Sequence, residues 1–167
     1  QGEKEKLTAY LNEMQEGELF QTKFERTDNF VIDSILSYKL QESDRLGIET
    51  KMDVKVPKDL NVSAYVLTGI LTNLLDNAIE ACEKVQDKKI KITIKYAKKM
   101  LIIRISNTYD GKEKFNSVMG IKTSKKDKEF HGYGIKSIRH MVESVDGDFE
   151  IHTKEEWFVA DVVIPLV

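Results

Sequence analysis

A long hydrophobic helix followed at once by two isoleucine-rich strands is the feature that most constrains how this chain can fold. Between Ser63 and about Lys84, apolar residues recur every three or four positions, which predicts a helix with one buried face. The residues of that face are Leu67, Ile70, Leu71, Leu74, Leu75, Ala78 and Ile79. Strands over about 89–96 and 101–107 follow, with a tight connection at 97–100. Such a helix has to bury its face against the strands, so we expect a helix layer on a sheet layer.

The segments before this helix extend the same pattern. We predict a helix that Thr27 or Asp28 caps and that Gly47 ends, followed by a strand over 48–54 in which apolar and charged residues alternate. The stretch Gly2–Gly17 is charged, and we interpret it as a solvated helix that needs a partner, or as a frayed tail. Its few apolar residues stand at helical spacing: Leu7, Tyr10, Leu11 and Met14.

The segments after the helix and strands complete the fold class. A polar, lysine-rich stretch over 108–130 is predicted to be an irregular loop, and a loop of that length is usually functional or disordered. A helix then runs to about Val145, and strands over 149–153 and 157–165 close the chain. This order predicts an α+β fold, a two-layer α/β sandwich with helices on one face of a mixed sheet.

Composition narrows the class of protein. The 167 residues carry 26 Lys+Arg and 28 Asp+Glu, a net charge of -2, which speaks against nucleic acid as a partner because counterion release needs a basic surface. The single Cys excludes an intramolecular disulfide framework. No apolar run approaches the roughly 18–20 residues of a membrane span. The first residue is Gln1 rather than Met, so we expect a fragment of a longer protein.

Two asparagines interrupt the hydrophobic helix. Asn73 and Asn77 stand four residues apart, on the same face, and would be costly to bury without partners. They either form a satisfied network within the protein or turn their carbonyl oxygens to a cation or phosphate. Mg²⁺ suits the second arrangement, because it accepts a few protein oxygens beside nucleotide phosphates.

A glycine-containing segment, 131–135 (HGYGI), leads into the next helix. Backbone N–H groups at a helix start attract anions, so this turn is either a phosphate site or a plain loop-to-helix turn. Just upstream, lysines cluster in the polar stretch, where they are either solvated or supply charge for a polyphosphate. They are Lys122, Lys125, Lys126 and Lys128.

Four segments occur in an order that resembles the GHKL ATP-binding fold, also called the Bergerat fold. They are 73–81 (NLLDNAIEA), Asn107 at a strand end, 123–125 (TSK) and 132–134 (GYG). The resemblance is strongest to the catalytic domain of sensor histidine kinases, in the peptide-quorum-sensing subgroup of the accessory-gene-regulator type. The segment 27–36 (TDNFVIDSIL) is similar to the part that joins the dimerisation helices to that domain. The resemblance implies a catalytic domain over 27–167, with 1–26 as the tail of an upstream dimerisation helix or a linker.

The resemblance also implies a role for each matching residue. Asn77 would bind Mg²⁺, and Asn73 would contact the phosphates of ATP or the water shell of the ion. Lys125 would lie near the terminal phosphate. A glycine box would wrap the phosphates: Gly132, Tyr133 and Gly134.

The base end of the site departs from the family pattern. Asn107 stands where the family usually has an Asp that accepts a hydrogen bond from adenine, and Asn donates as well as accepts, which weakens discrimination against guanine. The first glycine box retains only Gly111, with Tyr109 where a glycine is common. Asp110 is an alternative contact for adenine.

Asn73 indicates which chemistry to expect. The hydrolytic members of the fold (topoisomerase, mismatch-repair and chaperone types) and the anti-sigma-factor serine kinases resemble one another in carrying Glu at this position. Asn cannot accept a proton at neutral pH, so the chain is expected to transfer the phosphate rather than activate water. The alternatives are a non-catalytic nucleotide-binding regulatory module and a GHKL ATPase.

The phosphate acceptor is expected on an upstream helical hairpin that this chain lacks. The three histidines, His131, His140 and His152, are expected to have ordinary surface or packing roles. The chain is therefore predicted to bind ATP without phosphorylating itself. The resemblance implies its own dimerisation hairpin and a response regulator as partners. It also implies a cytoplasmic place in a membrane-anchored sensor, with no direct membrane contact by this fragment.

Overall fold

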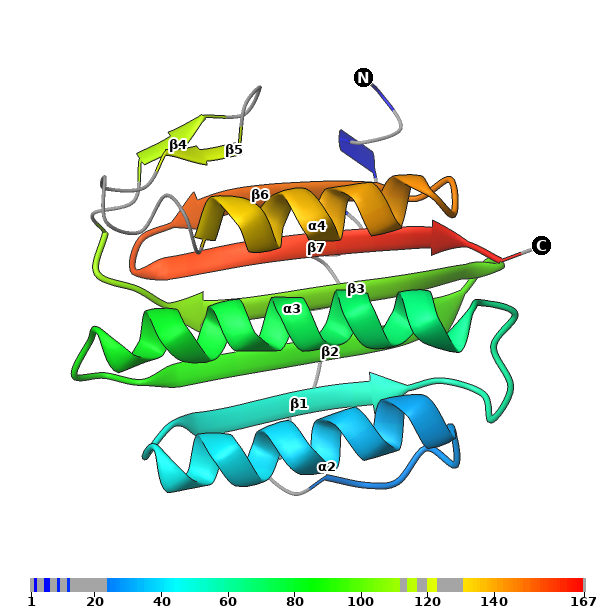
Figure 1. Ribbon diagram of the computed structural model, residues 1–167, viewed down its shortest axis with the longest axis horizontal. Coiled ribbons are helices and arrows are strands. Elements are labelled where there is room, and N and C mark those ends of the chain that lie inside the picture. The colour runs from blue at the N-terminus through cyan, green and yellow to red at the C-terminus, as the bar shows by residue number, and fades with distance from the viewer. Residues whose placement is uncertain are drawn as a thin grey trace.

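The computed structural model describes residues 24–111, 114–116, 120–122 and 131–166, and five single residues of the N-terminal stretch, Gly2, Glu5, Lys6, Ala9 and Asn12. In these residues helices cover one face of a five-stranded sheet, which confirms the α+β two-layer sandwich (Figure 1). The helices are α2 (Phe30–Arg45), α3 (Ala64–Glu83) and α4 (His131–Glu143). The strands of the sheet are β1 (Glu49–Lys55), β2 (Lys89–Ala97), β3 (Met100–Thr108), β6 (Asp148–Lys154) and β7 (Trp157–Pro165).

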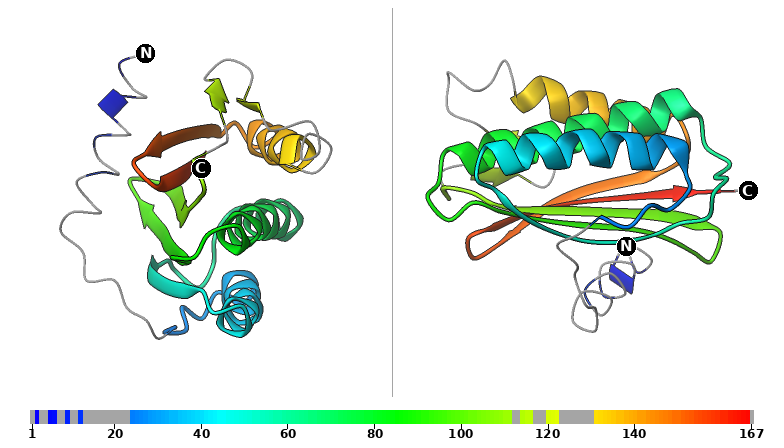
Figure 2. Two further views of the ribbon diagram at one scale, coloured as in Figure 1. Left: turned by 90° about the vertical axis from the view of Figure 1, so that its left-hand side faces the viewer. Right: turned by 90° about the horizontal axis from the view of Figure 1, so that it is seen from below.

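The sheet is mixed, as the sequence predicted. Its strand order is β1-β2-β3-β7-β6, so β1 and β6 form the two edges. β1 runs parallel to β2, and α3 makes the connection between them. The other neighbouring pairs are antiparallel. Both views of Figure 2 show α2, α3 and α4 on one side of the sheet.

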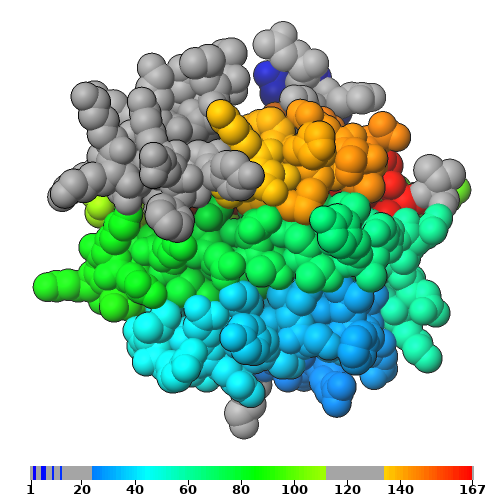
Figure 3. Space-filling view, viewed as in Figure 1, coloured from blue at the N-terminus to red at the C-terminus, as the bar shows by residue number. Residues whose placement is uncertain are grey.

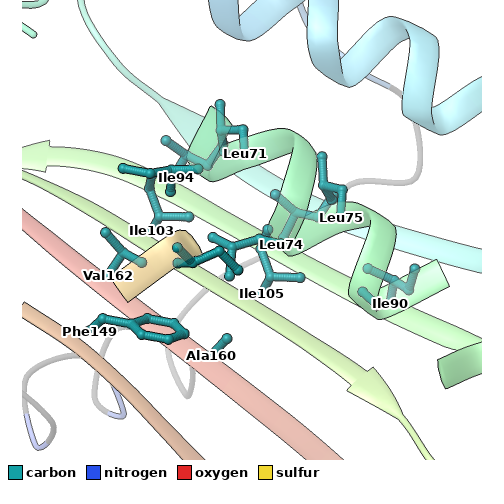
Figure 4. Close-up of a cluster of buried hydrophobic side chains, with 14 of the residues drawn as sticks. Leu71, Leu74, Leu75, Ile90, Ile94, Ile103, Ile105, Phe149, Ala160 and Val162 are labelled. Atoms are coloured by element: carbon teal, nitrogen blue, oxygen red, sulfur yellow. The ribbon is translucent and has the colours of Figure 1, made fainter. Parts of the chain in front are cut away.

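The hydrophobic core lies between the helices and the sheet. Leucines of α3 point down onto isoleucines of β2 and β3, and α4 adds Ile138 and Val142, which are fully buried (Figure 4). Alternation along β3 explains why this face is apolar: Leu101, Ile103 and Ile105 all belong to this core. The periodicity read from the sequence therefore identified the buried faces correctly.

Close packing holds α3 between its two neighbours (Figure 3). A Cβ at Gly69 of α3 would lie 2.4 Å from the Sδ of Met141 on α4, so any larger residue would require the Met141 side chain to move. On the other side, the Lys39 ammonium of α2 binds the Asp76 carboxylate of α3. The position of α3, which carries both asparagines, is thus set from two sides.

The start of α2 differs from the prediction. The residue that caps the helix is Asn29, whose side chain accepts a hydrogen bond from the N–H of Ile32 at 3.1 Å. Thr27 and Asp28 do not cap it, because both donate to the Asp33 carboxylate instead, at 2.6 Å from the Thr27 hydroxyl and 2.9 Å from the Asp28 N–H. The helix therefore begins one or two residues later than predicted.

Two further predictions are corrected in the second half of the chain. The stretch predicted to be irregular contains a small antiparallel hairpin, β4 (Lys114–Asn116) and β5 (Gly120–Lys122), which lies beside the start of α4. Helix α4 begins at His131, so Gly132 and Gly134 lie within its first turn rather than ahead of it. Within the described ranges, no helix combines the length and the apolar character that a membrane span needs.

Candidate functional site

A narrow pocket opens between the second half of α3, the start of α4 and the sheet beneath them. Figure 4 shows part of its wall, with Leu74, Ile105, Phe149 and Ala160 facing one another. The volume open to the centre of a water-sized sphere is about 10 Å³, room for about one water molecule, so the walls have to part to admit a larger ligand. Its lining residues are Leu74, Asn77, Ala78, Ile105, Asn107, Ile135, Ile138, Phe149, Ile151, Phe158 and Ala160.

Asn77 and Gly134 meet at one side of this pocket. A Cβ at Gly134 would lie 3.2 Å from Oδ1 of Asn77, which is tighter than most such contacts, and 3.6 Å from its Nδ2, which is ordinary contact. The missing side chain therefore makes the room in which the Asn77 amide sits. Because Gly134 lies in the first turn of α4, the amide stands beside backbone N–H groups that have no acceptor within the helix. This arrangement suits a cation and an anion bound together, with the amide oxygen on the cation and the helix N–H groups on the anion.

The side chains of Asn73 and Asn77 are half-buried and make no hydrogen bond to another described residue. Asn77 lines the pocket, whereas Asn73 lies one turn earlier on α3, outside the described lining. Asp76 stands between them in sequence, but its carboxylate is bound by Lys39 of α2. The two amides are thus the polar groups that this part of α3 has to offer a ligand.

Lys39 keeps the charge of Asp76 compensated. Burial alone would lower the pKa of Lys39, but its hydrogen bonds and ion pairs with Asp76 and Glu42 outweigh burial and raise the pKa. The Lys39–Glu42 distance is 3.2 Å. The ammonium therefore stays protonated at neutral pH, and Asp76 is held toward α2.

Asn107 supplies the polar group at the sheet side of the pocket. It lies near the end of β3 and is 3% exposed, and its Nδ2 donates to the carbonyl of Thr108 at 3.0 Å. Among the described residues nothing donates to its Oδ1, so that oxygen is available as an acceptor. The Thr108 hydroxyl in turn donates to the Asp87 carbonyl at 2.7 Å and accepts from the Lys89 N–H at 3.1 Å. The end of β3 that orients Asn107 is therefore tied to the α3–β2 connection.

The one cysteine belongs to this support rather than to any chemistry. Cys82 is fully buried, and its Sγ lies 3.7 Å from the Thr108 hydroxyl and 3.4 Å from the Lys89 carbonyl. Burial raises the pKa of the Cys82 thiol, so it remains protonated and unreactive.

The remaining predicted residues are placed less closely. Gly111 follows β3 on the exposed surface with φ +74°, a conformation that favours glycine. Asp110 is exposed and is not among the described lining residues. The backbones of Gly132 and Tyr133 lie in the first turn of α4, and nothing is described of their side chains. Lys125 lies outside the described residues, as do the neighbouring Thr123, Ser124, Lys126 and Lys128.

Two of the histidines can be located by their side chains. His140 is exposed on α4, and His152 lies on β6 with its Nδ1 3.9 Å from Asp161. Neither is among the residues that line the pocket. For His131 the backbone alone is described, at the first position of α4.

The aromatic residues at the wall of the pocket were not identified as site residues from the sequence. Phe158 lines the pocket, and Tyr109 packs against it edge to face, with ring centroids 5.9 Å apart. Tyr109 was noted only as a departure from a glycine position. Phe158 falls within the predicted strand 157–165, but nothing local indicated that β7 would lie next to β3 and bring the two rings together.

Comparison with known proteins now connects this geometry to a family. Residues 62–165 match the family model of the GHKL domain, and they include α3, the pocket and all the strands after it. The chain belongs to the GHKL family. No curated protein sequence matches it.

Solved structures of histidine kinases share the fold of this GHKL domain. The catalytic domain of the histidine kinase ThkA superimposes with a TM-score of 0.63 at 18% identity, over 89% of this chain and 97% of that one. The mycobacterial sensor histidine kinase MprB gives 0.59 at 14% identity, over 81% and 95%. The Acinetobacter baumannii histidine kinase AdeS gives 0.59 at 16% identity, over 81% of this chain, which spans 63% of the AdeS chain. Identities this low show the fold alone.

Proposed function

We propose that this GHKL domain is the ATP-binding catalytic domain of a sensor histidine kinase. The observation that carries the proposal is the contact of Gly134 with the Asn77 amide at the mouth of a pocket that has Asn107 on its sheet side. A base would enter the pocket, and its phosphates would lie at the start of α4. The assignment to the peptide-quorum-sensing subgroup rests on the segment 27–36.

The pocket suits a flat, mostly apolar base with a polar edge. Its walls are aliphatic and aromatic side chains, and Asn107 provides both an acceptor, Oδ1, and a donor, Nδ2. Since Nδ2 is already bonded to Thr108, Oδ1 would accept the hydrogen bond from the amino group of adenine. The Asn107→Asp variant is the natural comparison for base selectivity.

The phosphate side of the site is built from α3 and α4. The Asn77 Oδ1 would be a ligand of Mg²⁺, which takes its remaining oxygens from phosphate and water. The first-turn N–H groups of α4, at Gly132 and Gly134, would hold phosphate oxygens. Asn73 would contact the phosphates or the water shell of the ion, and Lys125 would neutralise the terminal phosphate.

These groups would position the nucleotide and neutralise the charge of its phosphates, which is most of what phosphoryl transfer requires. Asn73 cannot take a proton from water, so the pocket does not favour hydrolysis. The acceptor histidine would come from a dimerisation hairpin, and the phosphate would pass on to a response regulator. The described domain would thus be the cytoplasmic kinase part of a membrane-anchored sensor, with 1–26 as its link to the hairpin.

Calorimetric titration with ATP, with and without Mg²⁺, tests the site. We expect Mg²⁺-dependent binding that falls tenfold or more (about 1.4 kcal/mol) in Asn77→Ala. Gly134→Ala should weaken binding comparably, because its methyl group displaces the Asn77 amide. Thr68→Ala, an exposed position on the same helix, serves as the control and should bind as the natural chain does. Unaltered binding in both site variants would contradict this assignment.

A second experiment separates a kinase from an ATPase. The chain is incubated with Mg-ATP and a separately supplied acceptor hairpin, and phosphohistidine and free phosphate are both measured. Phosphohistidine that disappears with Asn77→Ala supports the kinase. Steady phosphate release without phosphohistidine would identify a hydrolase instead.

A further inference from the structure

The face of the sheet opposite the helices is buried although α2, α3 and α4 all lie on the other side. Ile102 is 0% exposed, Thr93 and Arg104 are 1% exposed, and all three belong to this face by strand alternation. Ile102 and Val163 form a hydrophobic cluster separate from the main core, with Ala97 and Met100 beside it. Residues of a sheet face become this inaccessible only when another layer covers them.

Arg104 shows which part of the chain lies there. Its Nε and Nη2 donate to the two carboxylate oxygens of Asp161, at 2.6 and 2.7 Å, and its Nη1 donates to the Oδ1 of Asn12 at 2.8 Å. Asn12 is 92 residues away in sequence and belongs to the N-terminal stretch. The described residues of this stretch lie on the side of the sheet away from the helices (Figure 2).

Two buried hydroxyls on the same face have no hydrogen-bond partner among the described residues. The Oγ1 of Thr93, directly opposite Arg104 in the β2–β3 register, and the Oγ of Ser106 are buried without a hydrogen bond to any described residue. Buried hydroxyls are normally bonded. The face therefore offers polar groups, together with an apolar floor, to whatever packs on it.

The N-terminal stretch has the complementary chemistry. Leu7, Tyr10, Leu11 and Met14 form an apolar stripe at helical spacing, and such a stripe has to be covered. The stretch carries four glutamates against two lysines, while β2 places a basic row on this face of the sheet. That row consists of Lys89, Lys91 and Lys95.

We propose that the face of the sheet opposite the helices, called the open face below, is the docking surface for the helical stretch Gly2–Gly17 of this same chain. Arg104, held by Asp161, is the polar anchor that binds Asn12, and the cluster around Ile102 and Val163 is the apolar floor. The sheet thereby lies between two helical layers. This inference does not depend on nucleotide binding, because no residue of the pocket takes part in it.

Thiol labelling of the complete chain tests the docking. Ser106→Cys places a thiol on the covered face with little change of shape, while the natural Cys82 stays inside the core. Two variants should undock the stretch: Asn12→Lys, which sets a cation against Arg104, and Leu7→Glu with Leu11→Glu. We expect each to raise the labelling rate of the introduced thiol about tenfold. Glu143→Gln changes the net charge by as much as Asn12→Lys does, at an exposed position of α4 on the other side of the sheet, and should leave the rate unchanged.

Equal rates in all of these chains would overturn the proposal. Protection that grows with protein concentration would also overturn it, because the occupant would then be a second copy. Trp157, the single Trp, gives an independent readout that leaves Ser106 in place: it lies on the same face, with the Lys91 Nζ 4.6 Å from its ring. Acrylamide should quench its fluorescence more strongly in Asn12→Lys than in Glu143→Gln, and identical quenching would contradict the docking.

Discussion

On its helix side the sheet presents an almost continuous apolar surface, whereas on its other side buried ions stand among the apolar residues. Neighbours on β3 show the contrast: Ile103 and Ile105 face the helices, and Ile102, Arg104 and Ser106 face away. The helix side is held mainly by apolar packing. The open side adds the Arg104–Asp161 pair and a 2.9 Å bridge between Lys95 and Asp53.

The two faces therefore contribute differently to the specificity of strand register. Apolar residues pack with many partners, but an ion pair is satisfied in one arrangement only. Arg104 and Asp161 stand directly opposite in the β3–β7 register and are 57 residues apart in sequence. A slip of one residue between these strands would turn one of the two charges toward the core and leave the other unpaired, so the pair disfavours wrong registers.

The largest effect is expected from breaking the ion pair. Asp161→Asn leaves the Arg104 guanidinium buried without its counter-charge and should lower the free energy of unfolding by about 3–5 kcal/mol. Replacing both partners, Arg104→Met with Asp161→Leu, should recover most of the loss because no unpaired charge remains. Urea denaturation of the natural chain and both variants measures these differences. A cost below about 1 kcal/mol for the single variant would mean that water already reaches the pair.

The next effect compares adjacent isoleucines on the two faces. Ile103→Ala removes a fully buried side chain from the main core and should cost about 2–5 kcal/mol. Ile102→Ala should cost less, toward the lower end of that range, since its cluster has fewer neighbours that would border the cavity. Equal losses in urea denaturation would show that the open face is packed as tightly as the core.

The smallest effect concerns pH and His152 on the open side. Burial lowers the pKa of His152 below its usual 6.5, even though Asp161 opposes the shift. The unfolded chain therefore takes up a proton at a pH where the folded chain does not, so stability falls as the pH drops below 6.5 and levels off below the lowered pKa. His152→Gln should lose less stability between about pH 7 and pH 5 than the natural chain. An identical loss would assign the acid sensitivity to other groups.

Much of the fold was predictable because its signals are local. The apolar periodicity of 63–84 identified the buried face of α3, and the α+β sandwich followed from the order of the predicted helices and strands. The α2 cap was misplaced because Thr27 and Asp28 are equally good capping residues by sequence, and only the position of Asp33 decides between them and Asn29. The β4–β5 hairpin carries no apolar alternation that could have indicated it.

The candidate site was predictable where it depends on helix spacing and not where it depends on tertiary contacts. Asn77 and Gly134 were both singled out, but their contact follows from the packing of α4 on α3. The apolar walls and the support of Asn107 by Thr108 depend on strand neighbours that no sequence motif specifies.

The strand order has a consequence for crowded conditions. A sheet with two free margins is a template on which strands of other molecules can add, and such growth leads to fibres. Here both edge strands carry charged residues: Glu49, Lys51 and Lys55 on β1, and Asp148, Glu150 and Lys154 on β6. Adding a strand to either edge would take these charged side chains partly out of water, so they disfavour such growth at high local concentration.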